Sequence, residues 1–202
     1  AVLTIAAGLH LAWTSLGSTF GQMGKQLLAV ILAMMLGRVT GRLLQLQKFS
    51  NRLGQYAREK LANPKPAGPG RFSEGFLVGT VLFCAAPLGV LGSVQDGLGG
   101  HWYTLGIKAV LDGLTVMAFA PVFGPGVLLS VLPVAAYQGT VTLGARWFGT
   151  LAPDPLLVDA VNATGGMLVF CVALLILNVR KVEVADYLPS LAFAPLLRWL
   201  LG

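Results

Sequence analysis

Three uncharged, apolar runs dominate this sequence, and each is long enough to cross a lipid bilayer as one helix. They cover residues 75–95, 126–145 and 160–179, and a transmembrane helix needs about 20 such residues. The chain is 55% hydrophobic and only 11% charged, whereas soluble domains carry about 25% charged residues. Because the bilayer core offers no partner to free backbone groups, the runs must be helical. The sequence therefore predicts an all-α, polytopic transmembrane helix bundle.

Four further segments are expected to span the membrane, although each is short or carries a charge. They cover residues 1–16, 26–44, 104–123 and 187–201. Together with the three uncharged runs, these segments give a prediction of seven spans.

The basic residues are concentrated in one segment, which predicts its side of the membrane. Eight of the fourteen Lys and Arg residues lie within residues 38–71, where Glu59 is the only acid. By the positive-inside rule, this loop is expected to be cytoplasmic. The smaller cluster at 180–181 falls on the same side in a seven-span topology. Because no aromatic platform is interleaved with the basic block, we predict no nucleic-acid partner and no lipid-headgroup site there.

A Pro- and Gly-rich stretch at residues 63–70 divides the chain, since its three prolines and two glycines cannot continue a helix. We predict an N-terminal pair of spans in residues 1–62, a loop at 63–71 and a five-span bundle in 72–202. The end of the first part, residues 44–61, has apolar residues at helical spacing. It is expected to form an amphipathic extension on the inner membrane surface.

Helix-breaking residues recur in the C-terminal part, at Pro87, in residues 121–126 and at Pro133. Broken membrane helices free backbone groups, and transporters use such breaks to build binding sites near the midplane. The alternative interpretation is kinks and tight packing, because Gly and Pro are common in membrane helices. Either way, the bundle is expected to contain broken helices.

A weak internal similarity suggests an inverted repeat. Residues 2–10 align without gaps on residues 167–175, matching Leu3 with Leu168 and Leu9 with Leu174. In the seven-span topology these segments run in opposite directions and each precedes a further span, as an inverted repeat requires. Two matched leucines also arise by chance in apolar sequence, so an unrelated pair of helices is the alternative.

Lys108 and Asp112 are the only charges in the 49 residues from 97 to 145. Four residues apart on a helix, they share a face and can pair, together with Thr104 and Thr115. Such a stripe is expected to face the bundle interior. Each charge costs about 2.5–3.5 kcal/mol to insert, which favours a function: Asp112 as a proton or cation coupling residue and Lys108 as its counter-ion. The alternative is a buried ion pair that fixes helix register.

Other polar residues are candidates for the same site. Gln95 and Asp96 lie in the Gly-rich segment 92–100, where Asp96 is expected either to form a turn or cap, or to line an outer vestibule with Gln95. Hydrogen bonding between helices is the alternative role for the polar residues of later spans. These residues are Ser130, Tyr137, Gln138 and Asn162. The glycines at 165–166 are expected to permit close helix approach.

No pattern typical of a cofactor, metal or enzyme site is present. Cys84 and Cys171 lie within apolar runs and are expected to be packing residues. His10 and His101 stand alone, without the spacing of metal ligands. We therefore predict no cofactor, no metal and no enzymatic activity. The small chain is expected to form a homodimer in the lipid bilayer.

Several sequence blocks carry a resemblance to a known family. Their order resembles the bacterial YdfK/YqgA-type inner-membrane proteins, a family defined by a domain of unknown function. The blocks are residues 82–84, 91–98, 108–113, 124–127, 130, 137–139, 165–166 and 188–189. From Phe72 onward the resemblance implies a multi-pass protein of the bacterial plasma (inner) membrane, associated with transport. Residues 1–16 resemble the second helix of the family, so its first helix is expected to precede Ala1. Residues 85–87, which include a proline, depart from the expected glycine-containing run.

Three functions compete on this sequence. The first is a secondary transporter of a small solute, either ionic or neutral, for which Lys108 and Asp112 form the coupling pair. The second is a membrane enzyme that uses the pair as acid and base, which would need a nucleophile or metal set that the sequence does not show. The third is a structural or partner-binding subunit in which the charges specify packing alone. The intramembrane charges favour the transporter.

Overall fold

The computed structural model describes residues 2–17, 19–62, 69–151 and 154–202, and in these residues it is built from helices alone. The all-α prediction is therefore confirmed. The elements are α1 (Val2–Thr14), α2 (Phe20–Leu43), α3 (Leu46–Ala62), α4 (Pro69–Ala85), α5 (Pro87–Gly99), α6 (Tyr103–Phe123), the short 3₁₀ helix η1 (Pro125–Ser130), α7 (Val131–Leu151), α8 (Pro155–Ile176), a second 3₁₀ helix η2 (Val184–Tyr187) and α9 (Ser190–Leu200).

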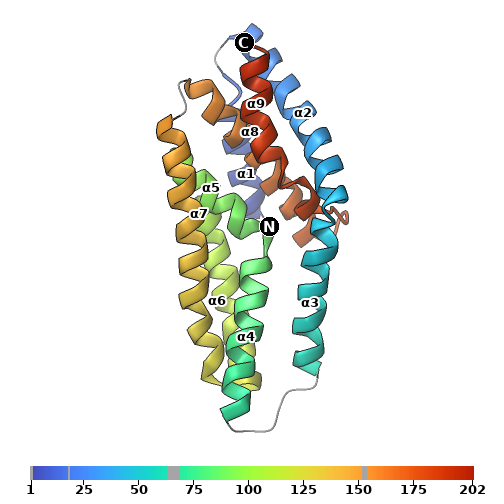
Figure 1. Cartoon of the computed structure of the whole chain (residues 1–202), viewed down its shortest axis with the longest axis vertical. Helices are drawn as coiled ribbons and strands as arrows, with labels where there is room; N and C mark the ends of the chain where they lie inside the picture. The colour runs from blue at the N-terminus through green and yellow to red at the C-terminus, as the bar shows by residue number, and fades with distance from the viewer. Residues whose placement is uncertain (1, 18, 63–68, 152–153) are drawn as a thin grey trace.

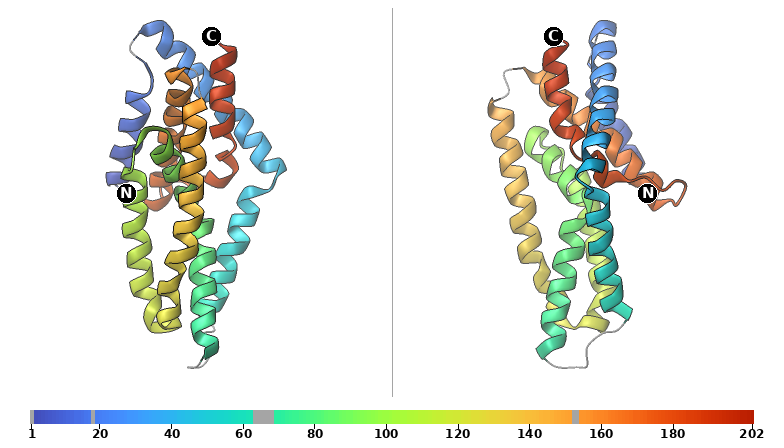
Figure 2. Two further views of the ribbon diagram at one scale, coloured as in Figure 1. Left: turned by 60° about the vertical axis from the view of Figure 1, so that its left-hand side comes forward. Right: turned by 45° about the vertical axis from the view of Figure 1, so that its right-hand side comes forward.

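The helices form an elongated bundle. Figure 1 shows α2 followed by α3 along one side of the molecule and α7 along the other, with α4 and α6 between them in the lower half. The upper half contains α8 and α9, and α5 lies where the two halves meet. In both views of Figure 2, α6 descends to the lower end and α7 returns from it.

The number of membrane-spanning helices is smaller than predicted. Within the described residues, four segments are long and apolar enough to cross a membrane: Phe20–Leu43, Tyr103–Phe123, Pro125–Leu151 and Pro155–Ile176. The bent pair α4–α5 makes a fifth if it counts as one span. Helices α1 and α9 have 13 and 11 described residues, short of the ~20 that a span needs. Within the described residues the structure thus supports four or five full spans rather than seven, and the orientation derived from seven spans stays a prediction.

The predicted span at residues 75–95 is broken in the middle. Helix α4 ends at Ala85, α5 begins at Pro87, and the two axes differ by 60°. Ala86 has an extended backbone, with φ −69° and ψ 119°, because the proline ring disfavours a helical residue before it. The break predicted at Pro87 is confirmed. The one predicted at Pro133 is wrong, since this residue lies in the first turn of α7, where proline is tolerated.

Loop boundaries also differ in detail from the predictions. Helix α4 already begins at Pro69, and residues 63–68 of the predicted loop lie outside the described residues. Helix α5 extends to Gly99, so the turn before α6 is short. The turn predicted at 121–126 is confirmed, with Gly124 at a φ of 73° that favours glycine.

The amphipathic segment at 44–61 forms α3, as predicted, and part of this helix packs along α4. Ala57 is buried against Val78 and Phe123. The Lys60 ammonium lies 3.3 Å from the Glu74 carboxylate of α4. The helix therefore has protein contacts on one face, in addition to any contact with the membrane surface.

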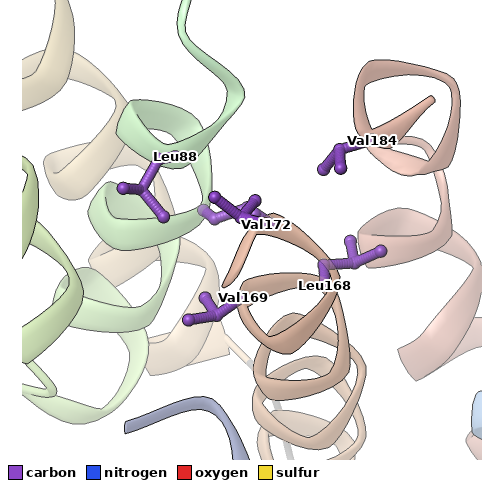
Figure 3. Packing of buried hydrophobic residues seen from close by; sticks show 6 residues of the cluster. Leu88, Leu168, Val169, Val172 and Val184 are labelled. Atoms are coloured by element: carbon purple, nitrogen blue, oxygen red, sulfur yellow. The ribbon is translucent and has the colours of Figure 1, made fainter. Parts of the chain in front are cut away.

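The core that positions α5 lies between this helix and α8. It consists of Leu88, Leu91, Leu168, Val169, Val172 and Val184. Figure 3 shows Val169 and Val172 of α8 directed toward Leu88, with Leu168 on the side of Val184. Cys171 packs against this core, and both Cys84 and Cys171 are free thiols, in agreement with a packing role. Helix α8 thus anchors α5 immediately after its bend.

Backbone-to-backbone contact joins α1 to α8. A Cβ added to Gly8 would lie 2.8 Å from the Gly166 carbonyl oxygen, and one added to Gly166 would lie 2.7 Å from the Gly8 carbonyl oxygen. The close approach predicted at Gly166 is therefore confirmed. Because Gly8 also meets Phe170, whereas Ala12 meets Gly166, the two helices run in opposite directions.

A similar crossing joins α2 to α9. A Cβ on Gly37 would lie 2.5 Å from the Ser190 nitrogen, and Ala33 packs with Ala194 in a small buried cluster. This order of contacts also makes the two helices antiparallel. The α1–α2 and α8–α9 pairs therefore pack in the mutual orientation that the inverted-repeat hypothesis requires.

We expect a Gly166→Leu substitution to destabilise the protein. The new side chain would meet α1 backbone atoms that cannot move without separating the helices, and overpacking of this kind costs about 1–3 kcal/mol or more. Thermal unfolding of the purified protein in detergent measures the loss. Gly139→Leu on α7 is the control, because a Cβ there meets nothing within 4 Å. Equal melting temperatures for the two variants would contradict the crossing.

Candidate functional site

Lys108 and Asp112 form the predicted ion pair on α6. The Lys108 ammonium donates a hydrogen bond to the Asp112 carboxylate, and the Lys108 side chain is 3% exposed against 25% for Asp112. Other faces of α6 are open, with Val110, Leu114 and Met117 exposed. The charged stripe therefore faces the protein interior, as predicted.

The aliphatic stem of Lys108 lies against Gly89 of α5. A Cβ added to Gly89 would lie 2.9 Å from Lys108 Cε and 3.0 Å from the Gln138 amide nitrogen of α7. The bend before Pro87 places this glycine between α6 and α7. Any larger residue at this position would compete with Lys108 and Gln138 for the same space.

A cavity of about 380 Å³ adjoins the pair, within the usual range of small-molecule sites, about 300–1,000 Å³. Its polar lining consists of Lys108, Asp112, Ser130 and Gln138. The Gln138 amide nitrogen is buried without a hydrogen-bond partner in the described residues. The remaining lining is apolar or glycine: Phe83, Leu105, Ala109, Gly113, Val116, Leu128, Val131, Val134 and Ala135. The site thus combines a few convergent polar groups with apolar walls.

Ser130 lines the cavity at the end of η1, immediately before α7. Its hydroxyl donates to the Val127 carbonyl at 2.6 Å, and its side chain packs on Gly79 of α4. Ser130 is therefore held on one side by its own helix η1 and on the other by α4. Its hydroxyl oxygen keeps acceptor capacity for a bound group.

Four of the eight predicted site residues do not line this cavity, and Tyr137 and Asp96 are two of them. Tyr137 is 37% exposed on α7 and does not line it. Asp96 does not line it either; its carbonyl accepts from the Gly100 N–H at 2.9 Å in the turn that ends α5. Helix α6 begins after Trp102 with no side-chain cap, so Asp96 does not cap it. Asp96 therefore lies in the last turn of α5, and its place in an outer vestibule stays a prediction.

Gln95 and Asn162 lie at a second place, where α5 crosses α8. The Thr104 hydroxyl donates to the Gln95 side-chain oxygen at 2.6 Å, one helical turn before Lys108. The Gln95 amide nitrogen lies 2.8 Å from the Cβ position of Gly165, and the Asn162 amide nitrogen lies 3.4 Å from that of Gly99. Six of the eight predicted residues are therefore divided between the cavity and a neighbouring polar crossing.

Sequence reasoning missed the face of α5 that meets α7. Gly89, Ser93 and Gly97 recur every four residues; Ser93 is fully buried, and the Cβ position of Gly97 would collide with the Thr142 carbonyl. Small residues at this spacing are typical of close helix packing in membranes. This spacing could have identified Gly89 as a position close to the ion pair.

Comparison with known proteins places the chain in a family. The family profile described as "Protein of unknown function (DUF554)" matches residues 1–199. The chain is 28% identical over 166 residues to "Uncharacterized membrane protein YdfK" of Bacillus subtilis (strain 168), covering 82% of this chain and 67% of the relative. It is 30% identical over 168 residues to "Uncharacterized protein YqgA" of Escherichia coli (strain K12), covering 82% and 71%. No solved structure matches it significantly. The chain therefore belongs to the DUF554 family, as its resemblance to YdfK and YqgA predicted.

Proposed function

We propose that this membrane protein is a secondary transporter of a small solute, with Lys108 and Asp112 as its intramembrane coupling pair. The observation that carries the proposal is the opposite-charge pair on the wall of a cavity of about 380 Å³ between α6 and α7. The bent α4–α5 pair lies beside it. Ionisable groups within membrane helices mark ion and solute pathways, and broken helices flank such sites in transporters.

The geometry supports a division of labour between the two charges. Asp112 is the more exposed partner and lines the cavity, so a proton or cation can reach its carboxylate. When Asp112 is neutralised, Lys108 loses its counter-ion and its ammonium can bind an anionic group of the solute. The Gln138 amide nitrogen offers a second donor, and the apolar walls suit a short hydrocarbon part.

We propose a transport role and no catalytic one. Ser130 supplies the hydroxyl that lines the cavity, and this hydroxyl already donates to the Val127 carbonyl. A nucleophile needs a base within hydrogen-bond reach, and the structure gives Ser130 none among the described residues.

The proposed setting is the bacterial plasma (inner) membrane, with the basic segment 38–71 in the cytoplasm and a homodimer as the assembly. The bacterial membrane relative YdfK supports the setting, and the excess of Lys and Arg in that segment supports the orientation.

Proton flux in proteoliposomes tests the function. Vesicles loaded with a pH-sensitive dye are offered glycine, alanine, lactate and succinate, and at least one solute is expected to drive saturable proton movement. Asp112→Asn should lower this flux roughly tenfold or more, the equivalent of about 1.4 kcal/mol, because the amide does not exchange a proton. Glu183→Gln, a change at an exposed loop residue, should leave the flux intact. Flux that survives Asp112→Asn unchanged would refute the coupling role.

A further inference from the structure

We infer that solute and water reach the Lys108–Asp112 cavity along a polar route through the crossing of α5 and α8, with the Gln95 side chain at its narrow point. The inference rests on the proposed function, because it assigns an access path to that site. It concerns residues outside the cavity itself.

Three polar side-chain atoms at this crossing are buried without a hydrogen-bond partner among the described residues. They are the Gln95 amide nitrogen, the Asn162 side-chain oxygen and His101 Nδ1. Gln95 is 1% exposed and Asn162 is 3% exposed. About 90% of buried polar groups in proteins have a partner, and leaving one unpaired is costly. Their concentration in one region points to a polar ligand that passes between them.

Glycines bring these three side chains together. The Cβ position of Gly99 lies 2.5 Å from His101 Nδ1 and 3.4 Å from the Asn162 amide nitrogen, and that of Gly165 lies 2.8 Å from the Gln95 amide nitrogen. The polar side chains therefore occupy space that any other residue at 99 or 165 would fill. The absence of two Cβ atoms makes room for polar groups between the helices.

The outer end of this route lies at the α5–α6 turn. His101 is partly exposed there. Asp159, on the first turns of α8, interacts electrostatically with both His101 and Asp154. The mouth of the route thus carries groups that interact with a charged or polar solute before it is desolvated.

The inner end connects to the ion pair through α6. Gln95 accepts from Thr104 at 2.6 Å, and Thr104, Lys108 and Asp112 share one face at four-residue intervals. Polar groups therefore continue from His101 past Asn162, Gln95 and Thr104 to the cavity. Rotation of the Gln95 side chain away from both Thr104 and the Cβ position of Gly165 would open the path.

The chemistry of the route defines the class of solute that it admits. The Gln95 nitrogen donates and the Asn162 oxygen accepts, so a molecule that carries both donors and acceptors is matched. Water and small solutes with amino, hydroxyl or carboxylate groups meet this requirement, whereas purely apolar molecules do not.

Thiol accessibility tests the route without requiring transport. In a chain with Cys84→Ser and Cys171→Ala, Thr104→Cys places a reporter on the route. Thr164→Cys is the matched control: Thr164 is also a buried threonine, but its hydroxyl donates to the Ala160 carbonyl of its own helix. Both are reconstituted and treated with a charged, membrane-impermeant methanethiosulfonate. The Thr104→Cys thiol should react about tenfold faster or more, and adding Gly165→Val should remove most of that difference.

Equal protection of the two thiols in folded protein would overturn the route. Gel filtration checks that each variant is folded. If Thr104→Cys does not yield a monodisperse protein, Asn162→Cys takes its place in the comparison with Thr164→Cys. The expected result and the contradicting result stay the same. Rapid labelling together with an absence of solute-driven proton flux would support the route and contradict the transporter. Solute-driven proton flux together with a protected Thr104→Cys thiol would support the transporter and contradict the route.

Discussion

A Lys108→Met protein should be markedly less stable than the wild type. The substitution leaves the Asp112 carboxylate against apolar walls without its counter-ion, and breaking a buried pair in this way costs roughly 3–5 kcal/mol. Because the Asp112 side chain is still 25% exposed, we expect the lower end of that range. Thermal unfolding in detergent measures the change.

Lys48→Met is the control for the loss of a positive charge, since Lys48 is exposed on α3. It should melt within a degree or two of the wild type, as surface substitutions usually change stability by less than about 0.5 kcal/mol. If Lys108→Met were as stable as Lys48→Met, the two charges would not depend on each other in the folded protein.

Gly89→Leu should abolish solute-driven proton flux. The leucine side chain would occupy the space of Lys108 Cε and the Gln138 amide, which lie 2.9 and 3.0 Å from the Cβ position. Displacing both groups removes the anion anchor and narrows the cavity, so we expect a loss of about a hundredfold, equivalent to roughly 2.8 kcal/mol. The dye assay in proteoliposomes measures it.

Gly144→Leu is the matched control, because this exposed α7 glycine has nothing within 4 Å of its Cβ position. It should support flux like the wild type. A Gly89→Leu protein that folds and transports normally would show that Lys108 and Gln138 are not positioned for the solute.

Much of the fold follows directly from residue patterns. Uncharged runs identified α7 and α8 because a bilayer-length apolar segment has no alternative to a helix. Four-residue spacing on one helix was sufficient to predict the pairing of Lys108 with Asp112, since the geometry of that contact is local. The break at Pro87 was equally local, because it depends on the missing N–H and the ring.

Tertiary arrangement set the limits of prediction from the sequence. Gln95 and Asn162 were expected beside the ion pair, but the 60° bend after Ala85 turns α5 toward α8 and places Gln95 on Gly165 instead. Ser130 and Tyr137 are seven residues apart, a spacing that predicts one shared helical face. In the structure Ser130 ends η1 and packs on Gly79 of α4, whereas Tyr137 on α7 remains 37% exposed. The sequence of the helix that carries a residue does not show whether another helix will cover it.

The double variant Lys108→Met with Asp112→Leu provides the most direct test of the proposed coupling pair. Replacing both charges of a buried pair by apolar groups is often neutral or stabilising, so the protein should fold and melt at or above the wild-type temperature. If the pair couples transport, this stable protein should show no solute-driven proton flux in dye-loaded proteoliposomes. Flux at the wild-type rate would contradict it and would assign the pair to the specification of packing alone.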